Sequence, residues 1–152
     1  MTPVQKRILG LDVGSRTIGM AVSDPLGITA QGLTTIRRQS KRKDFEQLAR
    51  VLKQYDVSEI VVGLPLHMSG QAGAQAEKMK AFAGELGKRF HVFVHLWDER
   101  LTSAQANRVL RESEISIRKR AEAVDRLAAV LILQAFLDAR GARKADSSVR
   151  PE

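Results

Sequence analysis

The 152-residue sequence has no cysteine and only 5% aromatic residues. The absence of cysteine excludes a disulfide-stapled fold, a thiolate zinc site and a cysteine nucleophile. No apolar run approaches the roughly 18 residues of a transmembrane helix, and the N-terminal segment meets Asp12 too early for a signal peptide. We therefore expect a cytoplasmic protein without a membrane partner.

Acidic residues are the minority among the charges, 17 against 25 Lys and Arg, so the formal net charge is +8. The corresponding pI is near 10.3. Such an excess favours a polyanionic partner, above all nucleic acid. The few aromatic residues do not support recognition by base stacking, and the position of the single tryptophan, Trp97, is more typical of core packing.

The spacing of apolar residues predicts an α/β domain. Residues 8–13 and 17–22 predict a β-hairpin around Gly14-Ser15-Arg16, and residues 28–36 a third antiparallel strand. Helix and strand then alternate, with helices over 44–55 and about 76–86 and strands over 60–64 and 91–97. Strands joined by helical crossovers pair in parallel. The result is a five-stranded mixed sheet flanked by helices.

The C-terminal third predicts two more helices. Thr102 to Gln105 has the form of a capping box, which favours a helix from Thr102 to about Arg111. Apolar residues from Val124 to Ala135 recur at helical spacing and predict a long final helix. We expect one folded domain over residues 1–139 and a flexible basic tail over residues 140–152.

Carboxylates occur at three points where sites tend to form. Asp12 interrupts an apolar strand, so it either accepts hydrogen bonds from the following turn or binds a metal ion. Asp98 and Glu99 follow a strand, where a solvated loop is the simpler interpretation. Asp125 precedes the final helical stripe and also suits a helix N-terminus. Convergence of the three would suit one or two Mg²⁺ or Mn²⁺ ions and phosphodiester hydrolysis.

Basic residues surround these acids. Residues 37–43 contain five cations, which contact phosphates or form a solvated loop. The residues predicted to contact nucleic acid are Arg16, Arg100, Arg118, Lys119 and Arg120.

Four segments together resemble the YqgF/RuvX family of RuvC-like nucleases: LDVGSRTIGMAVSD (11–24), VGLPLHMSG (62–70), DERLTS (98–103) and VDRLAAVLIL (124–133). The resemblance covers about residues 6–138 and implies a ribonuclease-H-like fold. It also implies that Asp12, Glu99 and Asp125 are the catalytic, metal-binding acids, with Asp98 as the rival to Glu99. The implied cofactor is Mg²⁺ or Mn²⁺, in two ions.

The resemblance implies a nuclease that matures the 5′ end of precursor 16S ribosomal RNA. Its alternative is a resolvase of four-way DNA junctions, which would favour a homodimer because paired cuts need two sites. A non-catalytic nucleic-acid-binding module in ribosome assembly is a third possibility, disfavoured by retention of all three acids. The chain departs from the family pattern at His67 and Ser69, so we transfer no catalytic role to them.

Overall fold

The structure, a computed structural model, describes residues 7–67, 69–102 and 118–149, with the backbone alone described at 118–125 and 143–149. Its elements in chain order are β1 (Arg7–Val13), β2 (Thr17–Ser23), β3 (Ala30–Gly32), β4 (Ile36–Arg37), α1 (Lys41–Gln54), β5 (Val57–Leu64), α2 (Ala74–Phe90), β6 (Phe93–Asp98), the 3-10 helix η1 (Glu99–Leu101) and α4 (Arg118–Val149). Within these ranges, no helix is both long enough and apolar enough to cross a membrane.

The strands form one mixed sheet, as expected. β1 and β2 are the predicted antiparallel hairpin, β5 joins β1 in parallel, and β6 joins β5 in parallel. The strand order is β3-β2-β1-β5-β6, and β4 also pairs with β2. Because α1 and α2 connect β4 to β5 and β5 to β6, they supply the crossovers that parallel strands require.

The third predicted strand is divided into two short ones. Gly32 in β3 pairs with Ala21, whereas Ile36 in β4 pairs with Ile18. If the pairing of β3 with β2 continued unchanged, residue 35 would lie opposite Ile18. Ile36 lies there instead, so the chain has one extra residue between β3 and β4, as in a β-bulge. The sheet therefore has six strands rather than five. The apolar and threonine-rich composition of residues 28–36 gives no sign of this break.

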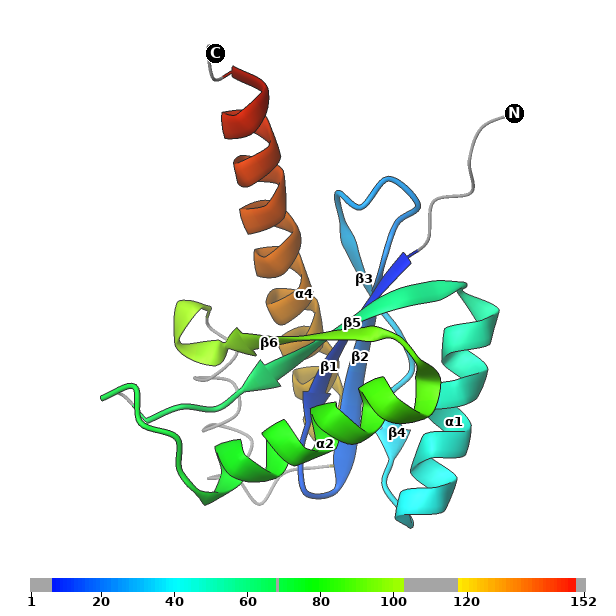
Figure 1. Cartoon of the computed structure of the whole chain (residues 1–152). Coiled ribbons are helices and arrows are strands. Elements are labelled where there is room, and N and C mark those ends of the chain that lie inside the picture. Colours follow the sequence, from blue (N-terminus) through cyan, green and yellow to red (C-terminus); the bar gives the residue numbers. More distant parts are fainter. Residues whose placement is uncertain (1–6, 68, 103–117, 150–152) are drawn as a thin grey trace.

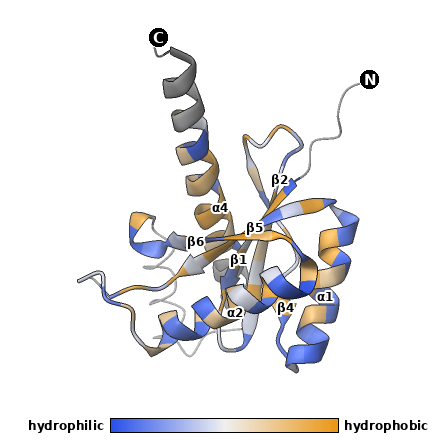
Figure 2. Ribbon diagram, in the orientation of Figure 1, coloured by the Kyte–Doolittle hydropathy of each residue, from blue (hydrophilic) through white to orange (hydrophobic). Residues whose placement is uncertain are grey.

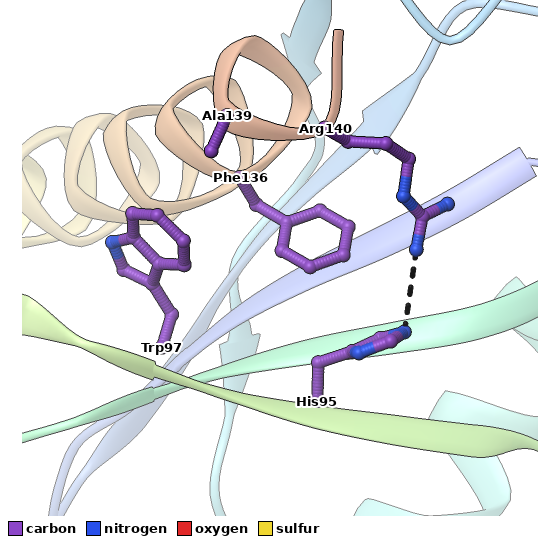
Figure 3. Close-up of a pocket in the computed structure, with 5 residues that line it drawn as sticks. All are labelled: His95, Trp97, Phe136, Ala139 and Arg140. Atoms are coloured by element: carbon purple, nitrogen blue, oxygen red, sulfur yellow. Dashed lines mark hydrogen bonds between the residues drawn. The ribbon is translucent and has the colours of Figure 1, made fainter. Parts of the chain in front are cut away.

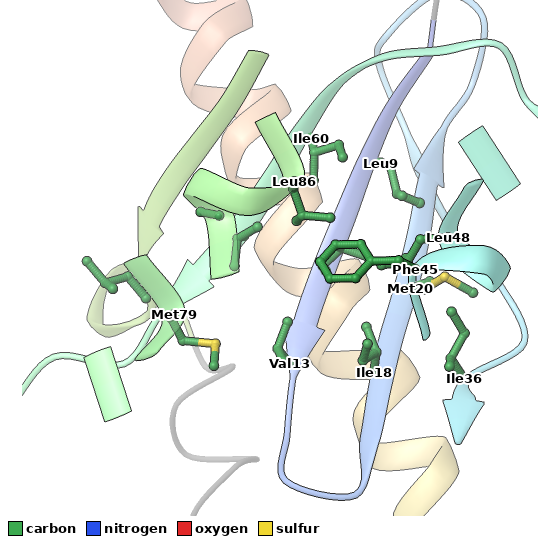
Figure 4. Packing of buried hydrophobic residues seen from close by; sticks show 14 of the residues in the cluster. Leu9, Val13, Ile18, Met20, Ile36, Phe45, Leu48, Ile60, Met79 and Leu86 are labelled. Carbon is green, nitrogen blue, oxygen red and sulfur yellow. The ribbon is translucent and has the colours of Figure 1, made fainter. Parts of the chain in front are cut away.

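One face of the sheet carries the larger core. Leu9, Leu11 and Val13 alternate along β1 and pack with Phe45 and Leu48 of α1 and with Leu86 of α2 (Figure 4). Both helices lie on this side of the sheet, opposite α4 (Figure 1). Hydrophobic and hydrophilic residues alternate along α1 and α2 (Figure 2), as expected for helices with one face on a core.

Helix α4 packs on the opposite face, directly against strand backbone. A Cβ added to Gly10 would lie 2.7 Å from the Cβ of Leu133 and 3.3 Å from the carbonyl oxygen of Ala129. A Cβ added to Gly63 would lie 2.6 Å from Cδ1 of Ile132. Glycine in β1 and in β5 therefore permits this close approach. The fully buried residues of α4 in this layer are Ala128, Ala129, Ile132 and Leu133.

Helix α4 continues to Val149, across the boundary that we expected between domain and tail. Residues 140–149 are therefore helical. Arg140 donates hydrogen bonds to both carboxylate oxygens of Glu59, at 2.9 and 3.0 Å, which connects α4 to β5. The helix expected to begin at Thr102 lies outside the described residues from 103 onward, and Thr102 itself ends η1.

We expect Gly10→Ala to destabilise the protein by about 1–3 kcal/mol, because the added methyl overpacks the contact between β1 and α4. Gly84→Ala is the matched control, since Gly84 lies in α2 with open space around the added Cβ. It should stabilise by about 0.5–1 kcal/mol through helix propensity. Urea unfolding with an unchanged m-value measures both. Equal stability of the two variants would contradict the packing argument.

Candidate active site

Asp12 is buried on the α4 side of β1. Its side chain is 1% exposed, and alternation along the strand places it on the same face as Gly10. The amide of Gly14 in the following turn donates to the carbonyl of Thr17 at 2.8 Å. That amide is therefore engaged within the turn.

Glu99 reaches the same face from the end of β6. It is fully buried, and a Cβ added to Gly63 would lie 2.5 Å from its Oε1. Leu11 of β1 pairs with Val62 of β5, so Gly63 lies beside Asp12 in the next strand. Neighbouring strands are about 4.8 Å apart. The Glu99 carboxylate thus lies over β5, within about one strand spacing of Asp12.

Asp98 has a different environment from Glu99. Its Oδ1 accepts from the backbone N–H of Arg100 at 3.0 Å and so caps η1. Its Oδ2 accepts from Nη2 of Arg100 at 2.6 Å, and this guanidinium holds the pKa of Asp98 below its ordinary value. Asp98 pairs with Leu64, whose side chain lies in the core under α1 and α2, whereas the Glu99 carboxylate lies beside Gly63 on the face that α4 covers.

Asp125 lies on the backbone of α4 one helical turn before Ala128 and Ala129, which are both fully buried. Helix α4 crosses Gly10 of β1 near Ala129 and Leu133. The part of α4 before Ala128 therefore lies over one end of β1, and the part after Leu133 lies over the other end. Ile8 belongs to the α4 cluster that includes Leu137, so the first turns of α4 lie toward the Asp12 end of β1. Among the side chains that the structure describes, no three form a metal site.

The five predicted nucleic-acid contacts lie in three places. Arg16 is exposed in the hairpin turn. Arg100 follows β6 and binds Asp98, and its guanidinium lies beside Gly70 in the loop before α2. Arg118, Lys119 and Arg120 are the first residues of α4, with the backbone alone described.

The loop that departs from the family pattern borders this region. The amide of His67 donates to Gln71 at 3.0 Å, and the amide of Gly70 donates to His67 at 2.8 Å. The His67 ring lies against Gly73, where an added Cβ would be 2.5 Å from Nε2. His67 therefore closes the loop that leads into α2, while Ser69 is exposed near its tip.

Sequence reasoning missed a buried clamp behind the hairpin turn. Asp44, in the first turn of α1, is 3% exposed. It accepts from the amide of Gln39 at 3.0 Å and pairs with Arg38, whose Nη1 donates to the carbonyl of Gly14 at 2.7 Å. Arg38 therefore supports the turn next to Asp12. An acid directly after a basic run was the available sequence signal.

A second cluster of charged side chains joins β5, β6 and α4. His95 lies 2.9 Å from Oε1 of Glu59, which also binds Arg140 through both carboxylate oxygens. Hydrogen bonding from Arg140, opposed by partial burial and aided by His95, lowers the pKa of Glu59 from 4.5 to about 2. The ionised Glu59 is thus stabilised in the folded state.

Solved structures define the class of fold. RuvC of Thermus thermophilus, in complex with a Holliday junction substrate, has a TM-score of 0.53 at 15% identity, covering 89% of this chain and 95% of that one. A second Thermus thermophilus RuvC structure gives 0.53 at 12% identity, covering 90% and 96%. At these identities the likeness shows the fold alone. The fold is that of the RuvC-like, ribonuclease-H-like nucleases, as expected.

Sequence comparison identifies the family. The RuvX family, described as Holliday junction resolvase, matches residues 6–139. A Koribacter versatilis protein is 62% identical over 138 residues, covering 91% of this chain and 90% of its own. A Thermoanaerobacter pseudethanolicus protein is 52% identical over 135 residues, covering 88% and 97%. Both are named "Putative pre-16S rRNA nuclease". The chain belongs to the RuvX family, and these descriptions all name nucleases.

We expect Arg140→Gln to raise the pKa of Glu59 toward 4.5, since the largest cause of its depression is removed. A depressed folded pKa contributes stability that is complete above about pH 4.5 and is lost as the pH falls toward about 2. The stability difference between wild type and Arg140→Gln should therefore shrink over that range. NMR titration of the Glu59 carboxyl and urea unfolding at several pH values measure this.

Lys80→Gln is the control for that experiment, because its ion pair with Glu77 is exposed. It should leave the titration of Glu59 unchanged. A stability difference for Arg140→Gln that is constant from pH 5 to pH 2 would show that the Glu59 pair does not cause it.

Proposed function

We propose that the chain is a divalent-metal-dependent nuclease that hydrolyses phosphodiester bonds in 5′-end maturation of precursor 16S ribosomal RNA. Asp12, Glu99 and Asp125 are its catalytic acids. The observation that carries the proposal is the burial of Asp12 and Glu99 on one sheet face, on either side of Gly63. The RNA substrate follows from the names of the relatives and would place the protein in the cytoplasm.

The carboxylates suit hard divalent cations. Mg²⁺ and Mn²⁺ prefer oxygen ligands, which carboxylates supply. Asp12, Glu99 and Asp125 would hold one or two such ions. Bound there, the ions would supply an activated nucleophile and stabilise charge on the attacking and leaving oxygens.

The chain's basic residues would hold the substrate strand. Arg16 is exposed in the turn that follows Asp12. Arg100 is oriented by Asp98 through the Nε and Nη2 contacts. Arg118, Lys119 and Arg120 begin the helix that carries Asp125. Phosphate contacts from three sides of the acids would position the strand for hydrolysis.

The alternative substrate is a four-way DNA junction, which the family's description favours. Symmetric cleavage of a junction needs two sites and hence a homodimer. Labelled precursor ribosomal RNA and a labelled junction, tested side by side with Mg²⁺ and Mn²⁺, separate the two. Cleavage of RNA alone supports the proposal, whereas paired cuts in both junction strands support the alternative. Tight binding without cleavage of either would favour a non-catalytic module.

We expect Asp12→Asn and Glu99→Gln each to reduce cleavage by more than about a hundredfold while preserving the fold and the affinity for nucleic acid. Replacing even the partners of metal ligands costs about 10–100-fold. Asp98→Asn is the matched control, because its remaining oxygen can still cap η1 and it faces away from α4. Its activity should fall by far less than that of Asp12→Asn or Glu99→Gln, because only the orientation of Arg100 is weakened. Full activity of Asp12→Asn, or loss in Asp98→Asn alone, would contradict the assignment.

We expect replacement of Lys119 and Arg120 by Ala to weaken binding of single-stranded RNA and to flatten its salt dependence. The slope of log affinity against log salt should fall by about 0.7 for each lost phosphate contact. Replacement of Lys78 and Lys80 by Ala, on the exposed side of α2, removes the same charge from the opposite layer. An identical slope change in both double variants would mean that total charge, not the start of α4, sets binding.

A further inference from the structure

A pocket of about 110 Å³ lies between β6 and α4. Its lining residues are His95, Trp97, Phe136, Ala139 and Arg140 (Figure 3). Three of them are ring systems. The Phe136 ring lies 4.8 Å from His95 and edge-on to Trp97 at 6.1 Å. The walls of the pocket are therefore mainly the faces and edges of rings.

The strand that lines the pocket, β6, leads directly into Glu99. Alternation along β6 places His95 and Trp97 on the face that α4 covers, and the Glu99 carboxylate lies on the same face, over Gly63. Trp97 pairs with Gly63, which lies beside Asp12. Trp97, at the near end of the pocket, is thus about two strand spacings, or about 10 Å, from Asp12. Phe136, Ala139 and Arg140 extend the pocket away from Asp12 along α4. A nucleic-acid strand held at the carboxylates would place a nearby nucleotide at this pocket.

The chemistry of the walls favours a flat, uncharged ligand. The Arg140 guanidinium stacks on Phe136 at 4.6 Å and is neutralised by two hydrogen bonds to Glu59. Because this charge is already paired, the pocket is poorly suited to a phosphate. Aromatic rings and a stacked guanidinium are the surfaces on which unpaired nucleobases stack. A volume of about 110 Å³ is also below that of pockets for drug-sized ligands.

We propose that this pocket binds one unpaired nucleobase of the RNA strand that is cleaved at the carboxylates. The proposal rests on the proposed function for the choice of nucleic acid as ligand. A base within a duplex is stacked and paired, so it cannot enter without being extruded. The pocket therefore selects a strand that is single-stranded next to its cleavage point. Base stacking, which the low aromatic content did not support, becomes available because the fold gathers distant rings.

Trp97 is the only tryptophan of the chain, so its fluorescence reports on this pocket alone. Asp12→Asn protein, without divalent metal, would be titrated with a short single-stranded RNA, with the same RNA annealed to its complement, and with single-stranded DNA of the same sequence. We expect both single strands to change Trp97 fluorescence and the duplex not to. Scanning an abasic nucleotide through the RNA should remove the signal at one position while binding persists.

Phe136→Leu keeps an apolar side chain but removes the central ring. We expect its affinity for single-stranded RNA to fall about tenfold to a hundredfold, the range for loss of one stacked base. Phe82→Leu, in the opposite layer, is the matched control, because Phe82 stacks on Phe45. Phe136→Tyr should retain most of the affinity and serves where Phe136→Leu does not fold.

The outcomes separate this inference from the proposed function. Constant Trp97 fluorescence while RNA saturates the protein would contradict base binding in the pocket, even if the RNA is cleaved. Equal signals from duplex and single strand, or equal losses in Phe136→Leu and Phe82→Leu, would do the same. A fluorescence change that only single strands cause, together with no RNA cleavage in Mg²⁺ or Mn²⁺, would support the base pocket. The same result would contradict the nuclease assignment.

Discussion

The close contact between α4 and the sheet is the constraint on which the rest of the structure depends. Gly10 and Gly63 lack the Cβ atoms that would collide with Leu133 and Ile132. The helix therefore packs directly against strand backbone, closer to the sheet than larger side chains would allow. Glu99 enters the space beside Gly63 that a larger residue would fill. One packing requirement thus sets both the position of the final helix and the room available to a carboxylate.

Burial of an acid does not by itself mark a site, as Asp44 demonstrates. Asp44 is nearly as buried as Asp12, and its carboxylate accepts from Arg38 and from the amide of Gln39 to support the hairpin turn. Asp12 and Glu99 differ in where they lie, since both face α4 across Gly63, reached from separate strands. The clamp formed by Asp44 and the candidate site meet at the hairpin turn, where Arg38 holds the carbonyl of Gly14.

Local patterns made the sheet predictable. The alternation in β1, the turn at Gly14 and the helical stripe in α4 each depend on neighbours in sequence, and each is found where it was expected. Features that depend on distant contacts were not accessible. The break between β3 and β4 arises from register against β2, and Arg38 finds its partner 24 residues away. The helix also continues beyond Arg140, which contacts Glu59 in β5. No local sequence pattern predicts this contact. The three catalytic acids stay a prediction, since the side chain of Asp125 is not described.

The side of the sheet that each β6 residue faces connects the proposed catalytic acids to the proposed base pocket. A shift of one residue in its pairing with β5 would exchange Glu99 for Asp98 on the α4 face, and it would also move Trp97 and His95 out of the pocket. The Glu59 pairing with His95 and Arg140 opposes such a shift, because it holds β5, β6 and α4 together at the far end of the pocket. A cluster away from the carboxylates therefore helps to determine which acid reaches the site. Sequence alone left Asp98 and Glu99 as rivals because the register of an edge strand is decided by contacts of this kind.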